Sequence, residues 1–397
     1  MAKKRHSKLK ITIALTLAII LIVLAVLGWY MYTYHNDTFM EYYNMLFSQE
    51  DADKGKSETG KTPVIIEGEL SIHFLDLGNS SPGDCIYIKA GDTDMLVDAG
   101  STAGSMETIG AYLDNYVTDG VFEYVVVTHS DLDHIACFQS DGGIFDTYEC
   151  EIIIDFPQSG STSKAYANYL KKREAEVAAG AKHYTALECC NETNGASKVW
   201  NLSEDVTMTI LSHKFYKTKA SDENNNSVCF MLTHGERNFL FTGDLEKEGE
   251  LSLVEENTLP EVVLFKAGHH GSPTSSNEEL LSVIKPQIVC VSCCAGSPKH
   301  GKSMPTTFPT QVMIDRIAKY TDRVYVPSAI NSRYVTDEDG KQKLEAVGDY
   351  YLLNGNIVVL SDEEKVTVNC SNNNSLLKDT DWFKEYRDTP SEWEKAA

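Results

Sequence analysis

The sequence predicts an α/β domain in which two β-sheets pack against each other and helices cover their outer faces. Short apolar or alternating segments that are typical of strands recur from about residue 64 to residue 369, and single amphipathic helices separate them. Gly-Asp turns join several of these segments. Strand clusters that alternate with single helices over about 300 residues are typical of two layers of sheet with helices outside.

The expected elements follow one another along this region. Helices are expected at 105–117, 161–181, 278–284 and 308–320, where apolar residues recur at helical spacing. Strands are expected at 70–78, 84–100, 124–129, 150–157, 205–212, 227–244 and 286–294, and a closing hairpin at 355–369. Residues 370–397 are polar and are expected to form a loose C-terminal tail.

The N-terminus differs in kind from this domain. Residues 1–10 are basic, and residues 11–32 contain no charged side chain and match the roughly 20 residues that cross a bilayer. A cleaved signal peptide is the alternative, but its apolar part is usually about 7–15 residues long. The segment therefore favours a transmembrane helix, with the basic end in the cytoplasm and the rest outside. Residues 33–63 are polar, without apolar periodicity, and are expected to form a flexible linker.

The overall charge restricts the partners of the domain. The chain of 397 residues has a net charge of −23, which argues against a broad electrostatic contact with phosphate backbones. Any contact with nucleic acid is expected to be local. The ten cysteines include no CxxC pair and no regular spacing, so the sequence leaves their disulfide state open.

The segment THSDLDH, which follows an apolar strand, carries the first chemical signal. It places four side chains of the kinds that bind metal ions within six positions: His129, Asp131, Asp133 and His134. A mixed set of imidazoles and carboxylates suits Zn²⁺ or a neighbouring first-row metal. The alternative is a solvated polar turn, because Asp and Ser are common in such loops.

Two further apolar segments end in residues of the same kind. The segment FTGD ends in Asp244, and the segment HHGS places His269 and His270 after a third apolar run. Turn chemistry explains one such strand end more easily than it explains three. Convergence of the three ends at one edge of the sheets is therefore the better interpretation.

These motifs, together with LDLGNSSPGDCIYIKAGDTDMLVDAG ahead of them, resemble the metallo-β-lactamase superfamily. The resemblance is to the branch found as the metallohydrolase domain of ComEC-type proteins of competence and DNA uptake. It covers roughly residues 68–365 and implies an αββα sandwich with a metal site at one edge of the two sheets, within a domain that spans 64–369. The motifs are specific for the family and much less so for the substrate.

The resemblance also implies a role for each residue of these motifs. His129 and Asp131 resemble the pair that holds a first metal ion, whereas Asp133 and His134 resemble ligands of a second. Asp244 resembles a carboxylate that bridges both ions.

Three further residues follow from the same resemblance. We prefer His269 as the remaining ligand and His270 as a group that contacts the substrate, although the sequence alone leaves this choice open. Asp98 resembles a carboxylate that orients a ligand histidine.

The chain departs from the common superfamily pattern at two positions and from the ComEC-type pattern at a third. The commoner motif has histidine where Asp131 stands, and another histidine ligand has only Asn225 as its counterpart, which is the ComEC-type residue. An amide oxygen binds zinc less well than imidazole, so a weaker first metal site is expected and the number of ions stays open. Third, no His-Pro pair occupies its usual place, although His300 stands nearby and is expected to reach the site.

The resemblance implies a membrane-anchored, metal-dependent hydrolase that acts through an activated water, with Zn²⁺ as the expected ion and Mn²⁺ as an alternative. Asp133, Asp244 and His270 are the expected catalytic residues, and phosphodiesters, DNA among them, are the expected substrates. Hydrolysis of an ester, a lactone or a cell-envelope component is a second interpretation. A non-catalytic binding module that retains the fold is a third. The expected location is the cell membrane, with the catalytic domain outside and the bilayer contacted through residues 11–32.

Overall fold

The computed structural model of the protein describes residues 70–299, 301–337, 340–362 and 364–394. The predicted transmembrane helix at 11–32, the linker and His300 lie outside these ranges. Within them, no helix combines the length and the apolar character needed to cross a bilayer.

The first sheet has eight strands in the order β18-β17-β1-β2-β3-β4-β5-β6. Its strands β3 to β6 run parallel to one another, and the others are antiparallel to their neighbours. The strands are β1 Leu70–Phe74, β2 Ile86–Ala90, β3 Thr93–Val97, β4 Val121–Val126, β5 Glu149–Asp155, β6 Lys182–Thr185, β17 Ile357–Ser361 and β18 Val366–Cys370. The pair β17–β18 is the closing hairpin that the sequence predicts.

The second sheet has seven strands in the order β14-β12-β11-β10-β9-β8-β7. Strands β10, β11, β12 and β14 are parallel, whereas β7 to β10 form an antiparallel ribbon. The strands are β7 Val199–Asn201, β8 Val206–Leu211, β9 Cys229–His234, β10 Arg237–Phe241, β11 Leu264–Lys266, β12 Ile288–Cys290 and β14 Val324–Tyr325.

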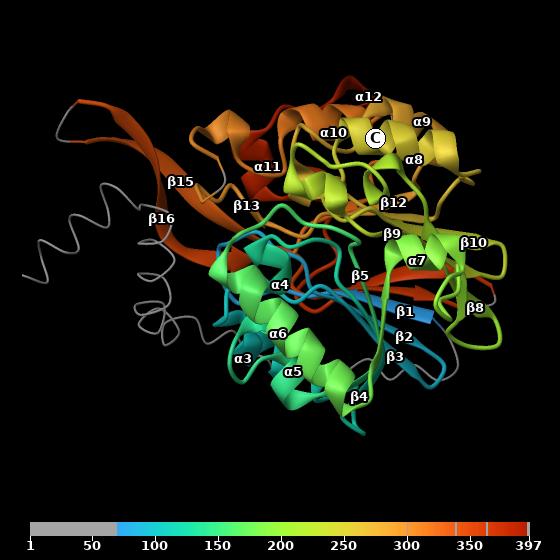
Figure 1. Ribbon diagram of the computed structural model, residues 1–397. Helices are drawn as coiled ribbons and strands as arrows, with labels where there is room; N and C mark the ends of the chain where they lie inside the picture. The colour runs from blue at the N-terminus through green and yellow to red at the C-terminus, as the bar shows by residue number, and fades with distance from the viewer. Residues whose placement is uncertain (1–69, 300, 338–339, 363, 395–397) are drawn as a thin grey trace, which may run out of the picture. The chain divides into compact units, whose positions relative to one another are not determined.

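Helices cover the outer face of each sheet, so the predicted two-sheet α/β class is confirmed (Figure 1). Apolar side chains of both sheets form one buried core between them, in which the rings of Phe74 and Phe241 stack at 6.4 Å. A second core lies under α8 to α10. The helices are α3 Ser105–Leu113, α4 Leu132–Gln139, α5 Ile144–Thr147, α6 Lys164–Ala179, α7 Ala186–Asn191, α8 Lys247–Glu256, α9 Glu278–Ile284, α10 Gln311–Ile317, α11 Asp381–Tyr386 and α12 Ser391–Glu394.

A third, small sheet extends from this body. Strand β13 (Cys294–Ala295) pairs with β15 (Ser328–Thr336), which forms a long antiparallel hairpin with β16 (Gln342–Leu352). Figure 1 shows the hairpin projecting away from the two main sheets. Tyr334 and Val347 on this hairpin are exposed.

The C-terminal segment differs from the loose tail expected at 370–397. Helices α11 and α12 bury Trp382, Phe383 and Trp393 in the second core. The indole Nε1 of Trp393 donates a hydrogen bond to the backbone oxygen of Thr321 at 2.9 Å. Large aromatic side chains in a polar segment are enough to hold it against the body, because each buries a large apolar surface.

A buried histidine in β1 makes the stability of this fold depend on pH. The Nδ1 of His73 lies 2.7 Å from Tyr112 Oη, and its Nε2 lies 2.8 Å from Ser71 Oγ. Burial lowers the pKa of His73 from 6.5 to about 3. As the pH falls below 6.5, the unfolded state takes up a proton that the folded state refuses, so the stability that this residue contributes is lost between these two values.

We therefore expect His73→Gln to reduce the pH dependence of unfolding. The loss of unfolding free energy between pH 7 and pH 5 should be smaller in the variant by about 2 kcal/mol, because each pH unit below 6.5 costs about 1.4 kcal/mol. Urea unfolding of both proteins at the two pH values measures this difference. Equal losses in both proteins would show that His73 takes up a proton in the folded state.

Candidate metal centre

The candidate site lies where parallel strands of both sheets end. Asp98 and His129 follow β3 and β4 of the first sheet, whereas Asp244, His270 and Ser292 follow β10, β11 and β12 of the second. Carboxyl ends of parallel strands share one edge of a sheet, where loops present side chains to a common point. The structure thus brings together the three segments whose convergence the sequence predicts.

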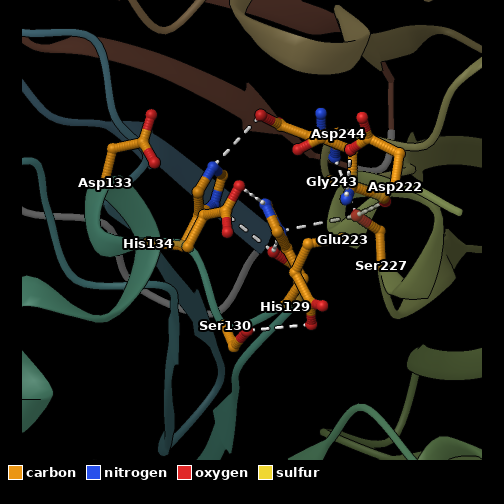
Figure 2. Close-up of polar contacts among 12 residues, drawn as sticks. His129, Ser130, Asp133, His134, Asp222, Glu223, Ser227, Gly243 and Asp244 are labelled. Carbon is orange, nitrogen blue, oxygen red and sulfur yellow. Dashed lines mark hydrogen bonds and ion pairs between the residues drawn. The ribbon is translucent and has the colours of Figure 1, made fainter. Parts of the chain in front are cut away.

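Two histidines face one carboxylate oxygen at the centre of the site. The Nε2 atoms of His134 and His270 lie 3.3 and 3.1 Å from Oδ2 of Asp244, and 3.2 Å from each other. Figure 2 shows His134 directed at Asp244, with Asp133 beside it. Asp133 Oδ2 lies 3.4 Å from His270 Nε2, and the Asp133 side chain is 19% exposed. The cluster is therefore open to solvent on the side of Asp133.

Both histidines are held from behind by a hydrogen-bond acceptor. The Nδ1 of His134 lies 2.8 Å from Oδ2 of Asp98, and the Nδ1 of His270 lies 2.9 Å from the backbone oxygen of Ser292. Because these oxygens accept, each Nδ1 carries a proton, and each Nε2 is the ring nitrogen left to bind an ion at the centre. This is the tautomer in which imidazole binds a metal ion.

Asp98 is the part of this arrangement that the sequence identifies. Its carboxylate is buried and also accepts from the backbone N and the Oγ1 of Thr128, at 2.8 and 2.7 Å. We expect Asp98→Asn to weaken Zn²⁺ affinity by about 10–100-fold, because the amide orients His134 less firmly.

Zn²⁺ titration of the purified chain, with circular dichroism to check the fold, measures this effect. Asp94→Asn is a matched control, since Asp94 is buried in the preceding strand β3 and binds Tyr87 and Lys89 instead. Equal Zn²⁺ affinities of the Asp98 variant and the control would exclude an orienting role.

Asp84 and Lys266 are not among the site residues that the sequence predicts. Lys266 is buried, and its Nζ lies 2.5 Å from Asp84 Oδ2 and 3.3 Å from Asp244 Oδ1. Asp84 in turn approaches the Nδ1 atoms of His270 and His134, at 3.4 and 3.8 Å. Asp84, His134, Asp244 and His270 form the one compact cluster of potential metal ligands among the residues that the structure describes. Since Asp84 faces the protonated side of both rings, it supports them from behind.

The electrostatics of the cluster favour positive charge at its centre. Burial alone would lower the pKa values of His134 and His270, but Asp244 and neighbouring carboxylates outweigh it and raise both well above 6.5. Burial alone would raise the pKa of Asp244, but His270, His134 and Lys266 hold it well below 3.8. A divalent cation at the centre would supply positive charge in place of the protons on the two histidines. The imidazole and carboxylate groups are suitable ligands for such an ion.

The other predicted site residues lie at the rim of this cluster. His129 Nε2 is buried without a hydrogen-bond partner and lies 3.7 Å from Asp131 Oδ2, and the Asp131 side chain is 44% exposed. The oxygen of Asn225 accepts a hydrogen bond from the backbone N of Glu246 at 3.2 Å.

The structure separates the two neighbouring histidines of HHGS. The Nε2 of His269 lies 3.9 Å from Asp244 Oδ2 and its Nδ1 lies 3.1 Å from Thr274 Oγ1, whereas His270 lies inside the cluster. The geometry favours His270 as the ligand, which reverses the preference for His269 given above.

No family model matches the chain, but several curated proteins do. The chain is 26% identical over 256 residues to Recombination protein 2 of Haemophilus influenzae, and 27% identical over 260 residues to Competence protein ComA of Neisseria gonorrhoeae. Each match covers 64% of this chain but only 27% and 30% of the relative. A shorter match, 30% identical over 106 residues, covers 26% of this chain and 12% of ComE operon protein 3 of Bacillus subtilis.

Solved structures resemble the chain at lower sequence identity than these curated proteins do. The metallo-β-lactamase fold protein YhfI from Bacillus subtilis shares 11% identity at a TM-score of 0.39, over 65% of this chain and 95% of that one. A metallo-β-lactamase from Cronobacter sakazakii shares 14% identity at a TM-score of 0.26, over 45% and 64% of the two chains. The predicted resemblance to ComEC-type competence proteins is confirmed by these curated relatives.

Proposed function

We propose that this chain, whose described part resembles the metallo-β-lactamase domain of competence proteins, is a metal-dependent hydrolase of phosphodiesters. One observation carries the proposal: the Nε2 atoms of His134 and His270 converge on one oxygen of Asp244 at 3.3 and 3.1 Å. Acceptors behind each ring fix this orientation at 2.8 and 2.9 Å. Two imidazoles and a carboxylate that meet at one point are the donor set of a metal site.

Asp133, His134, Asp244 and His270 would hold the metal ion. We expect Zn²⁺, with Mn²⁺ as the alternative, because imidazole and carboxylate donors suit both. When bound, such an ion supplies a Lewis acid for the phosphoryl oxygen and a water whose pKa is lowered toward about 7.

The side chains around the ion would have different roles in the reaction. Asp98 and the backbone oxygen of Ser292 keep the two imidazoles oriented, so little reorganisation is needed when the substrate binds. Asp133 is the partly exposed carboxylate of the cluster and is placed to accept a hydrogen bond from an attacking water. Asp244 compensates the positive charge at the centre.

Space for a substrate lies beside this cluster. A cavity of about 370 Å³ is lined by Asp131, Ser161, Lys219, Ser221 and neighbouring residues. Its lining combines two hydroxyl groups and one ammonium with the carboxylates of Asp131, Asp222 and Glu223, so its charge is negative in balance. Because the chain has a net charge of −23, we expect contacts with a short stretch of the phosphodiester and not with a long polyanion.

The competence-type relatives make DNA the first natural substrate to test. The purified full-length chain, in detergent and loaded with Zn²⁺ or Mn²⁺, should hydrolyse bis-p-nitrophenyl phosphate and single-stranded DNA. Parallel assays with p-nitrophenyl acetate and a lactone test the second interpretation from the sequence. Hydrolysis of the carboxylic esters alone would assign the chain to that class, and a chain that binds neither metal ion would favour the non-catalytic module.

We also propose that residues 11–32 anchor the protein in the cell membrane with the catalytic domain outside. The uncharged apolar stretch and the basic residues before it support this orientation. Protease added to intact cells should then digest the domain. Digestion only after lysis would place the domain in the cytoplasm.

A further inference from the structure

The two oxygens of Asp244 face different partners. Oδ2 points to the Nε2 atoms of His134 and His270, whereas Oδ1 lies 3.3 Å from the ammonium of Lys266. That ammonium also donates to the backbone oxygen of Gly243 at 3.1 Å and pairs with Asp84 at 2.5 Å. Lys266 is fully enclosed by these groups, so its charge is fixed beside Oδ1.

The opposite side of the site has few donors for a second ion. His129 and Asp131 lie there, but the Asp131 side chain is 44% exposed and the side-chain oxygen of Asn225 is used by the backbone N of Glu246. A tight zinc site usually has three or four protein ligands, and this side offers two.

His129 nevertheless presents a lone pair to the site. Its Nδ1 lies 3.1 Å from Thr128 Oγ1 and 3.5 Å from Ser227 Oγ. The Thr128 hydroxyl donates to Asp98, and the Ser227 hydroxyl donates to the backbone oxygen of Asn224. Both hydroxyls therefore accept from Nδ1 of His129. The Nε2 of His129 is therefore the acceptor nitrogen of the neutral ring, and it is buried without a hydrogen-bond partner.

We propose that Lys266 takes the place of a second cation in this centre. The chain then binds one metal ion tightly, at Asp133, His134, Asp244 and His270, and His129 Nε2 accepts a hydrogen bond from the substrate or its attacking water. This inference rests on the proposed metal-dependent function. The ammonium already occupies Asp244 Oδ1 at 3.3 Å, so this oxygen is not free to bind a second cation.

Metal binding without turnover tests the inference. Zn²⁺ titration of the full-length chain by calorimetry, with metal analysis after dialysis, should give one tight equivalent per chain. His129→Gln should keep that equivalent with less than about a threefold change in affinity, which is below 1 kcal/mol. His270→Ala should lose it. For the metal-loaded enzyme, His129→Gln should lower kcat/KM on bis-p-nitrophenyl phosphate.

A gain of binding tests the role of Lys266 directly. The double variant Asp84→Asn/Lys266→Met removes both buried charges together and should bind a second equivalent at least about tenfold more tightly than the wild type, a gain of about 1.4 kcal/mol. The matched control is Asp94→Asn/Lys89→Met, which removes an ion pair of 2.7 Å in strands β2 and β3. This control should bind one equivalent, as the wild type does.

The outcomes separate the inference from the proposed function. Two tight equivalents in the wild type, or loss of the tight equivalent in His129→Gln, would overturn the inference and leave the hydrolase proposal standing. An unchanged second affinity in the Asp84/Lys266 double variant would also overturn it. Absence of any tight equivalent in the wild type would overturn both.

Discussion

Asp244→Asn should lower kcat/KM on bis-p-nitrophenyl phosphate by about a thousandfold or more, a loss of roughly 4 kcal/mol of transition-state stabilisation. Asp244 Oδ2 is the common neighbour of three imidazoles, at 3.1 Å from His270, 3.3 Å from His134 and 3.9 Å from His269. Asparagine has nearly the same shape but no charge. The centre would therefore lose the carboxylate that compensates the metal ion.

Steady-state kinetics of the metal-loaded wild type and variant measure this loss. Asp94→Asn is the matched control, because it removes a buried carboxylate of β3 that contacts Tyr87 and Lys89. Circular dichroism should show that both variants are folded. Turnover within about tenfold of the wild type in a folded Asp244 variant would remove this residue from the catalytic centre.

His270→Ala should abolish tight Zn²⁺ binding, whereas His269→Ala should weaken it by less than about tenfold, or 1.4 kcal/mol. The two residues are neighbours in the chain, but only His270 lies within hydrogen-bonding distance of Asp244 and of the backbone oxygen of Ser292. His269 instead contacts Thr274 and stands at the rim. Removal of His270 leaves the ion one imidazole short and leaves Asp244 facing an empty space.

The pair of variants provides its own control, since each loses one histidine from the same short turn. Metal content after dialysis, measured by mass spectrometry, and Zn²⁺ titration distinguish them. The reverse order of effects would return the ligand role to His269, as the motif alone suggested.

Much of the fold follows from local pattern. Strands β4, β10 and β11 are apolar runs that end in polar side chains, and this pattern alone predicts that Asp244 and the 129–134 loop meet. Helix α9 occupies its predicted residues, 278–284, because Leu280, Leu281 and Ile284 repeat at helical spacing. Helices and strands of this kind can be predicted because burial of one face depends only on residues a few positions apart.

The choice between His269 and His270 depends on backbone conformation that the sequence does not specify. Both residues adopt left-handed φ values, 46° and 53°, in the turn after β11. Both residues are histidine, so no difference in local preference reveals which ring turns inward. The neighbouring strands and Ser292 decide it.

Asp84 and Lys266 could not be identified from spacing for a different reason. Asp84 precedes β2 and Lys266 is the last residue of β11, and the two pair only because the start of β2 meets the end of β11 in the folded chain. Because about 180 residues separate them, no local sequence pattern predicts that they form a pair. The one local signal is the lysine in the apolar run VVLFKAG, because a lysine is rarely buried unless it has a charged partner.

The position of the metal centre between the two sheets has a consequence for folding. Asp133 and His134 follow strand β4 of the first sheet, whereas Asp244 and His270 follow β10 and β11 of the second. An ion held by all four would act as a cross-link between the two sheets. Ligand linkage then adds about 2.7 kcal/mol to the free energy of unfolding when free ion exceeds its Kd a hundredfold. Chelation would withdraw that cross-link, so the same ion that supports hydrolysis would also govern how long the protein survives heat.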